Sequence, residues 1–406
     1  MLHHNITLIA QPSVQRFLIE HENEDEQMLV LKQKEVEGIP APIIATQLLG
    51  RRKAKTKLPT WYKTKGIIYP PSVNLEQCSS EATALFKSAI VNSVISKKEL
   101  AADLTGGFGV DTLFLSTIFK SIHYVEPDTA LQEIARHNHR QLKASNILHH
   151  CSAAEGFINL TPLQFDLVYI DPSRRDEQSR KIFKLSDCIP DITRLQSTLL
   201  DKSQFLLLKA SPLLDIQQGL REISQVKEVY VVSVNNECKE LLFLADKYDA
   251  HETQVTAVDL FEHGEVRSSF TFTVREERDA LVKFGDPDHY LYEPNASILK
   301  SGAFKLIAEK FHLIKLAPNT HLYTSSTQVA DFPGKTFKVE FLDPDAKQLI
   351  ALLPDRKVNV VSRNYPLTPD QIKIKYRLQD GGKKFLLAFS SSKKKHLALC
   401  ARITST

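Results

Sequence analysis

Two aspartates enclose a glycine-rich segment that is the first candidate for chemistry in this chain. The segment reads Asp103-Leu-Thr-Gly-Gly-Phe-Gly-Val-Asp111. Gly106, Gly107 and Gly109 carry no Cβ, so the backbone can take positive φ there and approach a ligand closely. The pattern predicts a strand-to-helix turn that binds a nucleotide-like ligand. The alternative is a plain glycine-rich turn with a solvated acid.

The residues around this turn favour S-adenosylmethionine over a dinucleotide. A dinucleotide fingerprint needs a third glycine where Thr112 stands, and Asp111 would oppose a pyrophosphate at the helix start. S-adenosylmethionine has no phosphates, and Asp103 can pair with its ammonium group. Glu126 follows an expected strand about 20 residues further on, where an acid binds ribose hydroxyls. Both signals point to the same ligand.

A second candidate follows the apolar run Phe165-Asp-Leu-Val-Tyr-Ile170. Asp171 comes directly after it, at the carboxyl end of an expected central strand, where open α/β sheets bind ligands. The lone pair of an exocyclic amine is delocalised into its ring, and hydrogen bonds from the amine to acceptors help to localise it. The Asp171 carboxylate and the Pro172 carbonyl can be those acceptors. In-line placement then supplies most of the catalysis, so we expect neither a metal nor a strong base.

Alternating strands and helices must position these groups. Strands are expected at 100–104, 121–125, 147–151, 165–170 and 204–208, with helices at 111–117 and 130–143. Continuous apolar strands between helices are typical of a doubly wound parallel sheet, so the fold class is α/β. Two further strands, 228–234 and 240–244, are joined by Asn235-Asn236-Glu237 and predict a final antiparallel hairpin.

Over roughly residues 71–248 these motifs resemble class I S-adenosylmethionine-dependent methyltransferases, which have a Rossmann-like sheet. The resemblance implies that the glycine turn, with Thr105, binds the cofactor, and that Glu126 and Pro127 contact its ribose region. It also implies an adenine-contacting loop at Cys151-Ser-Ala-Ala-Glu155, with Ser152 and Ala153, and a catalytic loop at Asp171-Pro-Ser-Arg-Arg175. By motif the chain is similar to guanine-N2 methyltransferases of the trimethylguanosine synthase type.

The flanking segments predict further domains. Residues 1–70 are expected to form a small helical domain with a basic linker, and residues 71–250 the methyltransferase domain. Residues 251–338 look like a ferredoxin-like domain and residues 339–406 like a THUMP-like domain, which gives two small C-terminal α+β domains. True THUMP domains bind RNA, so an RNA substrate (tRNA, rRNA or another structured RNA) is implied by analogy.

The catalytic loop departs from the amino-methylating pattern of Asp or Asn, Pro, Pro and an aromatic. Ser173 and Arg174 occupy the last two places. Guanidinium planes also stack on bases, so Arg174 or Arg175 is expected to stack or to bind phosphate. Tyr69 or Phe183 could supply the aromatic instead. In the competing interpretation the two arginines only pair with acidic residues that follow them, Asp176 and Glu177.

Several other residues have two interpretations. Glu76 and Gln77, with Ser79 and Glu81, are expected at the wall of the cofactor and substrate pocket, with a capping box or a core contact as the alternative. Lys209 either contacts substrate or is solvated at a strand end. Uridine C5 methylation is disfavoured because Ala210 stands where its cysteine nucleophile is required. Four histidines are expected on the surface rather than at a metal, namely His137, His139, His149 and His150.

Composition limits the remaining classes. The 406 residues carry a net charge of +4 and five scattered cysteines, which we expect to be reduced. The chain has no apolar run of transmembrane length, and its start lacks signal-peptide features, so we expect a cytoplasmic protein with no membrane partner. A basic segment at 51–65 includes Trp61 and Tyr62 and fits either nucleic-acid contact or a solvated linker. A second basic set spans 373–395 and could also face nucleic acid.

These observations favour methyl transfer to an exocyclic amine of an RNA base, guanine N2 or adenine N6. A methyltransferase acting on protein or a small molecule is one alternative. A non-catalytic RNA-binding protein that retains the cofactor fold is the other.

Overall fold

The computed structural model describes residues 2–174, 184–249 and 251–403. Its contacts divide the chain into two compact units. The first holds Met1–Asn235, Lys239–Glu252 and Leu260–Val266, and the second holds Asn236–Cys238, Thr253–Asp259 and Arg267–Thr406. Along the described residues no helix combines the length and the apolar character needed to cross a membrane.

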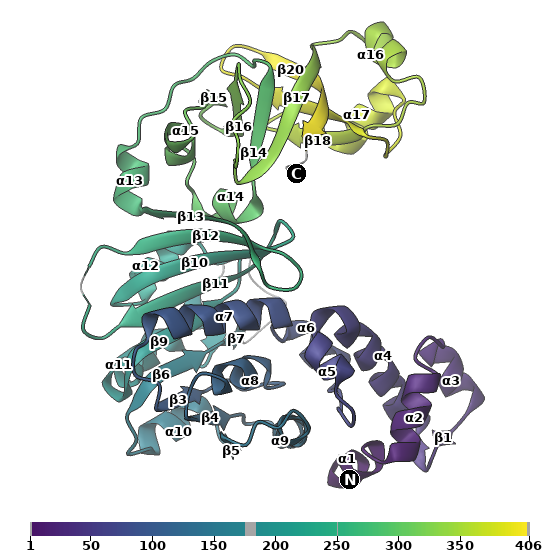
Figure 1. Cartoon of the computed structure of the whole chain (residues 1–406), viewed down its shortest axis with the longest axis vertical. Helices are drawn as coiled ribbons and strands as arrows, with labels where there is room; N and C mark the ends of the chain where they lie inside the picture. The colour runs from purple at the N-terminus through teal and green to yellow at the C-terminus, as the bar shows by residue number, and fades with distance from the viewer. Residues whose placement is uncertain (1, 175–183, 250, 404–406) are drawn as a thin grey trace. The chain divides into compact units, whose positions relative to one another are not determined.

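The strands of the first unit form a sheet in the order β10-β11-β9-β6-β3-β4-β5 (Figure 1). Their bounds are β3 Leu100–Asp103, β4 Ser121–Val125, β5 Ile147–His150, β6 Phe165–Ile170, β9 Ser203–Ala210, β10 Val226–Val234 and β11 Glu237–Asp246. The five strands from β9 to β5 in this order are parallel, whereas β11 is antiparallel to β9. Asp103 is paired with Tyr169 across β3 and β6, so the carboxyl ends of these strands lie together.

Helices connect these strands, and polar side chains start them. They are α7 Glu81–Val94, α8 Val110–Ser116, α9 Thr129–Gln141, α10 Ala154–Leu160, α11 Ile192–Lys202 and α12 Ile216–Glu222. Ser80, Asp128, Asp191 and Asp215 each precede a helix and accept hydrogen bonds from its first-turn amides. Caps of this kind contribute about 1 kcal/mol each, so the helix starts are fixed locally.

The N-terminal helices share an apolar core with the helices of the sheet. They are α1 Leu2–Ile9, α2 Pro12–Glu20, α3 Glu26–Lys32, α4 Ala41–Lys57, α5 Pro59–Lys63 and α6 Ser72–Gln77, with two short strands, β1 Glu35–Val36 and β2 Ile39–Pro40. Trp61 is fully buried in this core together with Phe108, which lies within the glycine turn, and Leu113, which follows it on α8. The helical region therefore supports the turn from behind.

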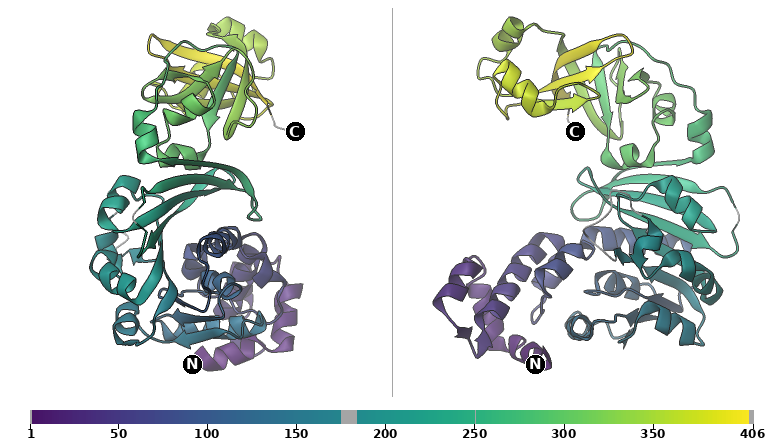
Figure 2. Two further views of the ribbon diagram at one scale, coloured as in Figure 1. Left: turned by 60° about the vertical axis from the view of Figure 1, so that its left-hand side comes forward. Right: turned by 180° about the vertical axis from the view of Figure 1, so that it is seen from behind.

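The second unit contains a seven-stranded sheet in the order β15-β16-β14-β17-β20-β19-β18. Its strands are β14 Tyr290–Pro294, β15 Ile314–Ala317, β16 Thr320–Ser325, β17 Gly334–Leu342, β18 Asn359–Arg363, β19 Lys384–Ser390 and β20 Lys395–Ile403. The helices are α13 Val274–Asp279, α14 Ala296–Ser301, α15 Leu306–Lys310, α16 Ala346–Leu352 and α17 Pro369–Tyr376, of which the last two lie beside the final strands (Figure 2). Two earlier strands, β12 Gln254–Leu260 and β13 Val266–Thr273, belong mostly to this unit.

The predicted fold class is confirmed, including the parallel sheet, the helical N-terminal region and the C-terminal α+β parts. The hairpin turn is also present, because Asn235 and Asn236 have φ values of 50° and 65°, as a two-residue hairpin turn requires. One feature was not foreseen. β14 pairs antiparallel with β17, so the two C-terminal α+β parts share one continuous sheet.

Candidate active site

A cavity of about 970 Å³ lies at the carboxyl ends of β3, β6 and β9. One group of lining residues comes from the turn after β3 and from the ends of β4 and β5, namely Leu104–Asp111, Glu126, Pro127, Leu131 and Ala153–Glu155. The other group comes from α6, the loop after β6 and the strands beyond it, namely Asn74, Gln77–Ser79, Asp171–Ser173, Ile189, Pro190, Lys209–Ser211 and Lys239. The two halves of the predicted site therefore share one cavity.

Two of the three glycines in the turn are required by packing. A Cβ at Gly106 would lie 2.2 Å from the Tyr124 ring, and one at Gly109 would lie 2.4 Å from His139 Nε2. Gly107, with φ of 53°, meets only a backbone oxygen at 3.8 Å. Gly107 and Gly109 take positive φ, but the prediction of positive φ is wrong for Gly106. Gly107 is the position with open space beside its Cα, where a ligand could approach the backbone.

Glu126 holds the turn and also lines the cavity. Its Oε2 accepts from Gly107 N at 2.9 Å and its Oε1 accepts from Asp128 N at 2.9 Å. Burial raises the pKa of Glu126. Tyr124 also holds Gly107 in place, because its hydroxyl donates to Gly107 O at 2.5 Å. Each carboxylate oxygen has a second lone pair, which leaves Glu126 able to accept from hydroxyl groups in the cavity.

Asp103 lies behind the turn and is outside the set of cavity-lining residues. Thr112 Oγ1 donates to its Oδ2 at 2.5 Å, and Thr105 N donates to its Oδ1 at 3.1 Å. The carboxylate is fully buried, and this burial raises its pKa to about 7. Thr112 therefore has a structural role, because a glycine at this position would leave Asp103 without its hydroxyl donor.

Two hydrogen bonds, one of them between main-chain atoms and one to the Thr105 hydroxyl, join the glycine turn to the loop after β6. Asp171 N donates to Thr105 Oγ1 at 2.7 Å, and Leu104 N donates to Tyr169 O at 3.0 Å. The Asp171 side chain is 32% exposed and forms an ion pair with Lys209. Burial lowers the pKa of Lys209, but the carboxylates of Asp171 and its neighbours outweigh this effect and raise it. Lys209 therefore stays protonated and holds one face of the Asp171 carboxylate.

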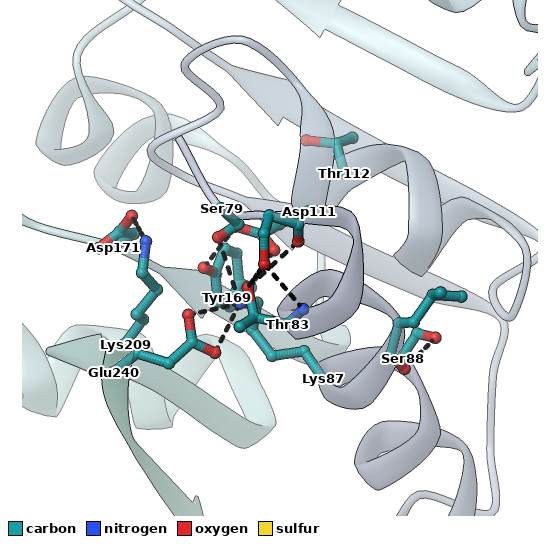
Figure 3. A network of polar contacts seen from close by, with 12 residues as sticks. Ser79, Thr83, Lys87, Ser88, Asp111, Thr112, Tyr169, Asp171, Lys209 and Glu240 are labelled. Carbon is teal, nitrogen blue, oxygen red and sulfur yellow. Dashed lines mark hydrogen bonds and ion pairs between the residues drawn. The ribbon is translucent and has the colours of Figure 1, made fainter. Parts of the chain in front are cut away.

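A buried polar network adjoins this pair (Figure 3). Lys87 Nζ donates to both carboxylate oxygens of Glu240, at 2.8 and 2.9 Å, and lies 3.2 Å from Asp111 Oδ1. Asp111 Oδ2 accepts from Ser79 Oγ at 2.7 Å and from Tyr169 Oη at 2.9 Å. Burial raises the pKa of Asp111, but Lys87 and Lys209 outweigh it and lower the pKa. Asp111 is thus held by protein partners at the cavity wall.

Neither Lys87 nor Glu240 is among the residues predicted for the site. A signal for Lys87 was present, because it occupies the apolar stripe of α7 with Ala84, Ile90 and Val91. A lysine at such a position must be buried, and a buried lysine needs a carboxylate partner. Glu240 offered no comparable signal, since its partner is 153 residues away in the sequence.

The cavity collects most, but not all, of the predicted site residues. Those that line it are Thr105, Gly106, Gly107, Gly109, Asp111, Glu126, Pro127, Ala153, Asp171, Pro172, Ser173, Gln77 and Lys209. Asp103, Ser152 and Glu76 lie outside the lining, and Glu76 pairs with Lys53 instead. The side chains of Arg174 and Arg175, like Phe183, Asp176 and Glu177, lie outside the described residues. The binding and catalytic roles of all these residues stay predictions.

Two expectations about rings are wrong. His139 is 1% exposed, not on the surface, because its Nε2 bonds with Gly109 O at 2.9 Å and its Nδ1 with His149 at 2.9 Å. Burial lowers its pKa to about 4, so the ring is neutral and supports the turn. Tyr69 is also buried, at 3% exposed, and cannot stack on a substrate base.

The basic segment at 51–65 belongs to the folded N-terminal helices and is not a solvated linker, whereas its contact with nucleic acid stays a prediction, since Lys55, Lys63 and Lys65 are exposed. It forms α4 and α5, and Trp61 is fully buried, so its ring cannot stack on a base. Arg51 pairs with Glu22 at 2.9 Å, and Arg52 pairs with Glu26. Part of its charge is therefore neutralised within the N-terminal helices. Ion pairs also occupy part of the second basic set, at Lys373, Lys384, Lys393 and Lys394.

Comparisons with known proteins agree with this architecture. Residues 290–333 match a family described as a ferredoxin-like domain, and residues 334–402 match one described as THUMP domain-like. The structure is similar to one titled "Crystal structure of putative methyltransferase from Porphyromonas gingivalis W83", with 29% identity and a TM-score of 0.84, over 97% of this chain and 98% of that one. No curated protein matches the chain.

Lower similarity extends to an rRNA methylase from Streptococcus thermophilus. It has 13% identity and a TM-score of 0.31, over 40% of this chain and 96% of that one, too low to support an argument. The extended match to the Porphyromonas gingivalis structure covers both units. The chain therefore has the class I S-adenosylmethionine-dependent methyltransferase fold, with a ferredoxin-like and a THUMP-like domain at its C-terminal end.

Proposed function

We propose that this protein transfers a methyl group from S-adenosylmethionine to an exocyclic amine of an RNA base, guanine N2 or adenine N6. The observation that carries the proposal is that Asp171 and Pro172 share one cavity with Glu126 and the open position Gly107. The THUMP-like match supports RNA as the acceptor, since THUMP domains bind RNA. The Porphyromonas gingivalis similarity supports methyl transfer as the reaction class.

The donor half of the cavity has groups that suit this cofactor. Glu126 would accept from the ribose hydroxyls, and Gly107 would let the backbone approach the adenosine closely. The buried Asp103 would stabilise the ammonium end through its negative charge. Asp111 at the start of α8 sets a carboxylate where a dinucleotide would place its pyrophosphate. The donor set thus fits a cationic ligand without phosphates.

The acceptor half would orient the amine. S-adenosylmethionine supplies a methyl group on a sulfonium, which is a good leaving group. The Asp171 carboxylate and the Pro172 carbonyl would accept from the two amine hydrogens, which localises the nitrogen lone pair for attack. As the nitrogen–carbon bond forms and the carbon–sulfur bond breaks, the amine proton would pass to Asp171 and then to water. Lys209 would keep that carboxylate in position through the ion pair.

Transfer of tritiated methyl to total RNA from cells that lack the enzyme tests the proposal. We expect Asp171→Ala to lower the transfer rate by at least about 100-fold, because the side-chain acceptor that orients the amine and takes its proton is removed. Its affinity for S-adenosylmethionine should change little. Asp201→Ala is a matched control, because Asp201 is an exposed aspartate on α11 outside the cavity.

Nucleoside analysis of the labelled RNA distinguishes the two amines, as N2-methylguanosine or N6-methyladenosine. Equal labelling by wild type and Asp171→Ala would remove Asp171 from the mechanism. Label recovered in protein and absent from RNA would move the acceptor to the alternative substrate class. Cofactor binding without any transfer would favour the non-catalytic alternative.

A further inference from the structure

The departure at Ser173 and Arg174 leaves the face of a target base without the usual aromatic partner. A base whose amine is methylated must leave its stack, and enzymes hold such a base between aromatic or apolar side chains. Tyr69, an aromatic residue considered for this role, is buried. Among the described residues, the cavity wall itself can supply a partner for the ring face.

The loop after β6 continues into a small two-stranded sheet. In it β7 (Ser173–Arg174) pairs antiparallel with β8 (Cys188–Ile189), and Ser173 lies opposite Ile189. This pairing brings a residue from 16 positions further along the chain to the place where the pattern departs. Ile189 and the adjoining Pro190 both line the cavity together with Asp171.

Ile189 presents its side chain to the cavity instead of a core. Cys188 is fully buried and Ile189 is 53% exposed, as expected for neighbours on opposite faces of a strand. The other large apolar side chains that line the cavity are at most 8% exposed, namely Leu104, Phe108, Val110 and Leu131. Among the described lining residues, Ile189 is thus the large apolar side chain with surface left to bury.

We propose that Ile189 is the platform for the ring face of the acceptor base, in place of an aromatic residue. The inference rests on the proposed function and adds the residue that holds the base. The base packs flat against Ile189 and Pro190 while its amine reaches Asp171 and the Pro172 carbonyl. An aliphatic side chain makes no hydrogen bonds with the base, so it holds either purine. The polar groups around Asp171 then select the base.

The test compares Ile189→Ser and Ile189→Phe in methyl transfer to total RNA from cells lacking the enzyme, at subsaturating RNA. Burying an isoleucine side chain against a base is worth roughly tenfold or more in affinity, so Ile189→Ser should lower the initial rate about tenfold. Ile189→Phe restores a ring platform and should keep at least the wild-type rate. S-adenosylmethionine affinity should stay within about twofold in both variants, because Ile189 lies in the acceptor half.

Leu160→Ser is the matched control. Leu160 is 86% exposed at the end of α10, outside the cavity lining, so the same loss of apolar surface should leave the rate unchanged. A wild-type rate in Ile189→Ser, while Asp171→Ala is inactive, overturns the platform and leaves the proposed function standing. Absence of labelled RNA with the wild-type protein overturns the RNA assignment and the platform together.

Discussion

Replacing Lys87 with methionine tests the buried network that adjoins the site. The Lys87 side chain is 1% exposed, and its ammonium bonds to both oxygens of Glu240, which is 2% exposed. Methionine has a similar length and no charge. The variant therefore keeps the packing of α7 but leaves Glu240 without its bonded cation. Asp111 retains its bonds from Ser79 and Tyr169.

The size of the effect follows from how Glu240 can respond. A buried carboxylate without its cation takes up a proton, and each pH unit above its unfolded pKa of about 4.3 then costs about 1.36 kcal/mol. At pH 7 the cost is at most about 3.7 kcal/mol, because burial already raises the pKa of Glu240 beside Lys87; breaking a buried ion pair costs about 3–5 kcal/mol. The folded variant binds a proton that the unfolded chain does not, so its stability falls as pH rises. At pH 5.5 the cost should be only about 1.6 kcal/mol.

Urea unfolding followed by the fluorescence of Trp61 measures this cost. Trp61 is the single tryptophan of the chain, and it is fully buried in the core behind the glycine turn, so it reports on the first unit. The double variant Lys87→Met/Glu240→Gln should be more stable than Lys87→Met at pH 7, with little pH dependence. Lys120→Met, which breaks the exposed pair with Glu99, should cost under about 1 kcal/mol. A cost below 1 kcal/mol for Lys87→Met, or additive effects in the double variant, would refute the reasoning.

Two further predictions concern the cofactor turn. Gly109→Ala should lower the free energy of unfolding by about 1–3 kcal/mol in the same assay, because Gly109 has φ of 82° and a Cβ would overlap His139. If the double variant Gly109→Ala/His139→Ala recovers this loss, the ring is the obstacle. Calorimetry should show S-adenosylmethionine affinity rising from pH 5.5 to 7.0, by at most about tenfold per unit, as Asp103 with its raised pKa of about 7 ionises. The affinity of Asp103→Asn for S-adenosylmethionine should not change with pH over this range, which lies below the α-amino pKa of about 7.7–8.0. A wild-type affinity that does not change with pH would contradict the role of Asp103.

The strands at the centre of the sheet could be predicted from the sequence because their signal is local. β4 and β6 begin and end where the apolar runs do, and α7 begins after the Ser80 cap. The positions of Asp171 and Glu126 follow from the same reasoning, since both come directly after a buried strand. A continuous apolar run bounded by polar residues is sufficient to locate such strand ends.

What the sequence could not indicate depends on residues that are distant in the chain. The need for glycine at 106 and 109 comes from Tyr124 and His139, which lie on a strand and a helix further along. The shared C-terminal sheet depends on the pairing of β14 with β17. A local pattern cannot distinguish a glycine needed for a ligand from one needed for a neighbouring ring, because both positions exclude a Cβ.

The backbone bonds between the turn and the loop after β6 explain why the loop can depart from the amino-methylating pattern. Leu104 and Asp171 are fixed by bonds that cross from β3 to β6. These bonds set the distance between the donor and acceptor halves through main-chain atoms and the Thr105 hydroxyl. The identities of residues 173 and 174 do not enter that geometry, so the chain can change them and supply the apolar wall from β8. The Asp171-Pro172 pair, to which the proposed mechanism gives the orientation of the amine, stands before the point of departure.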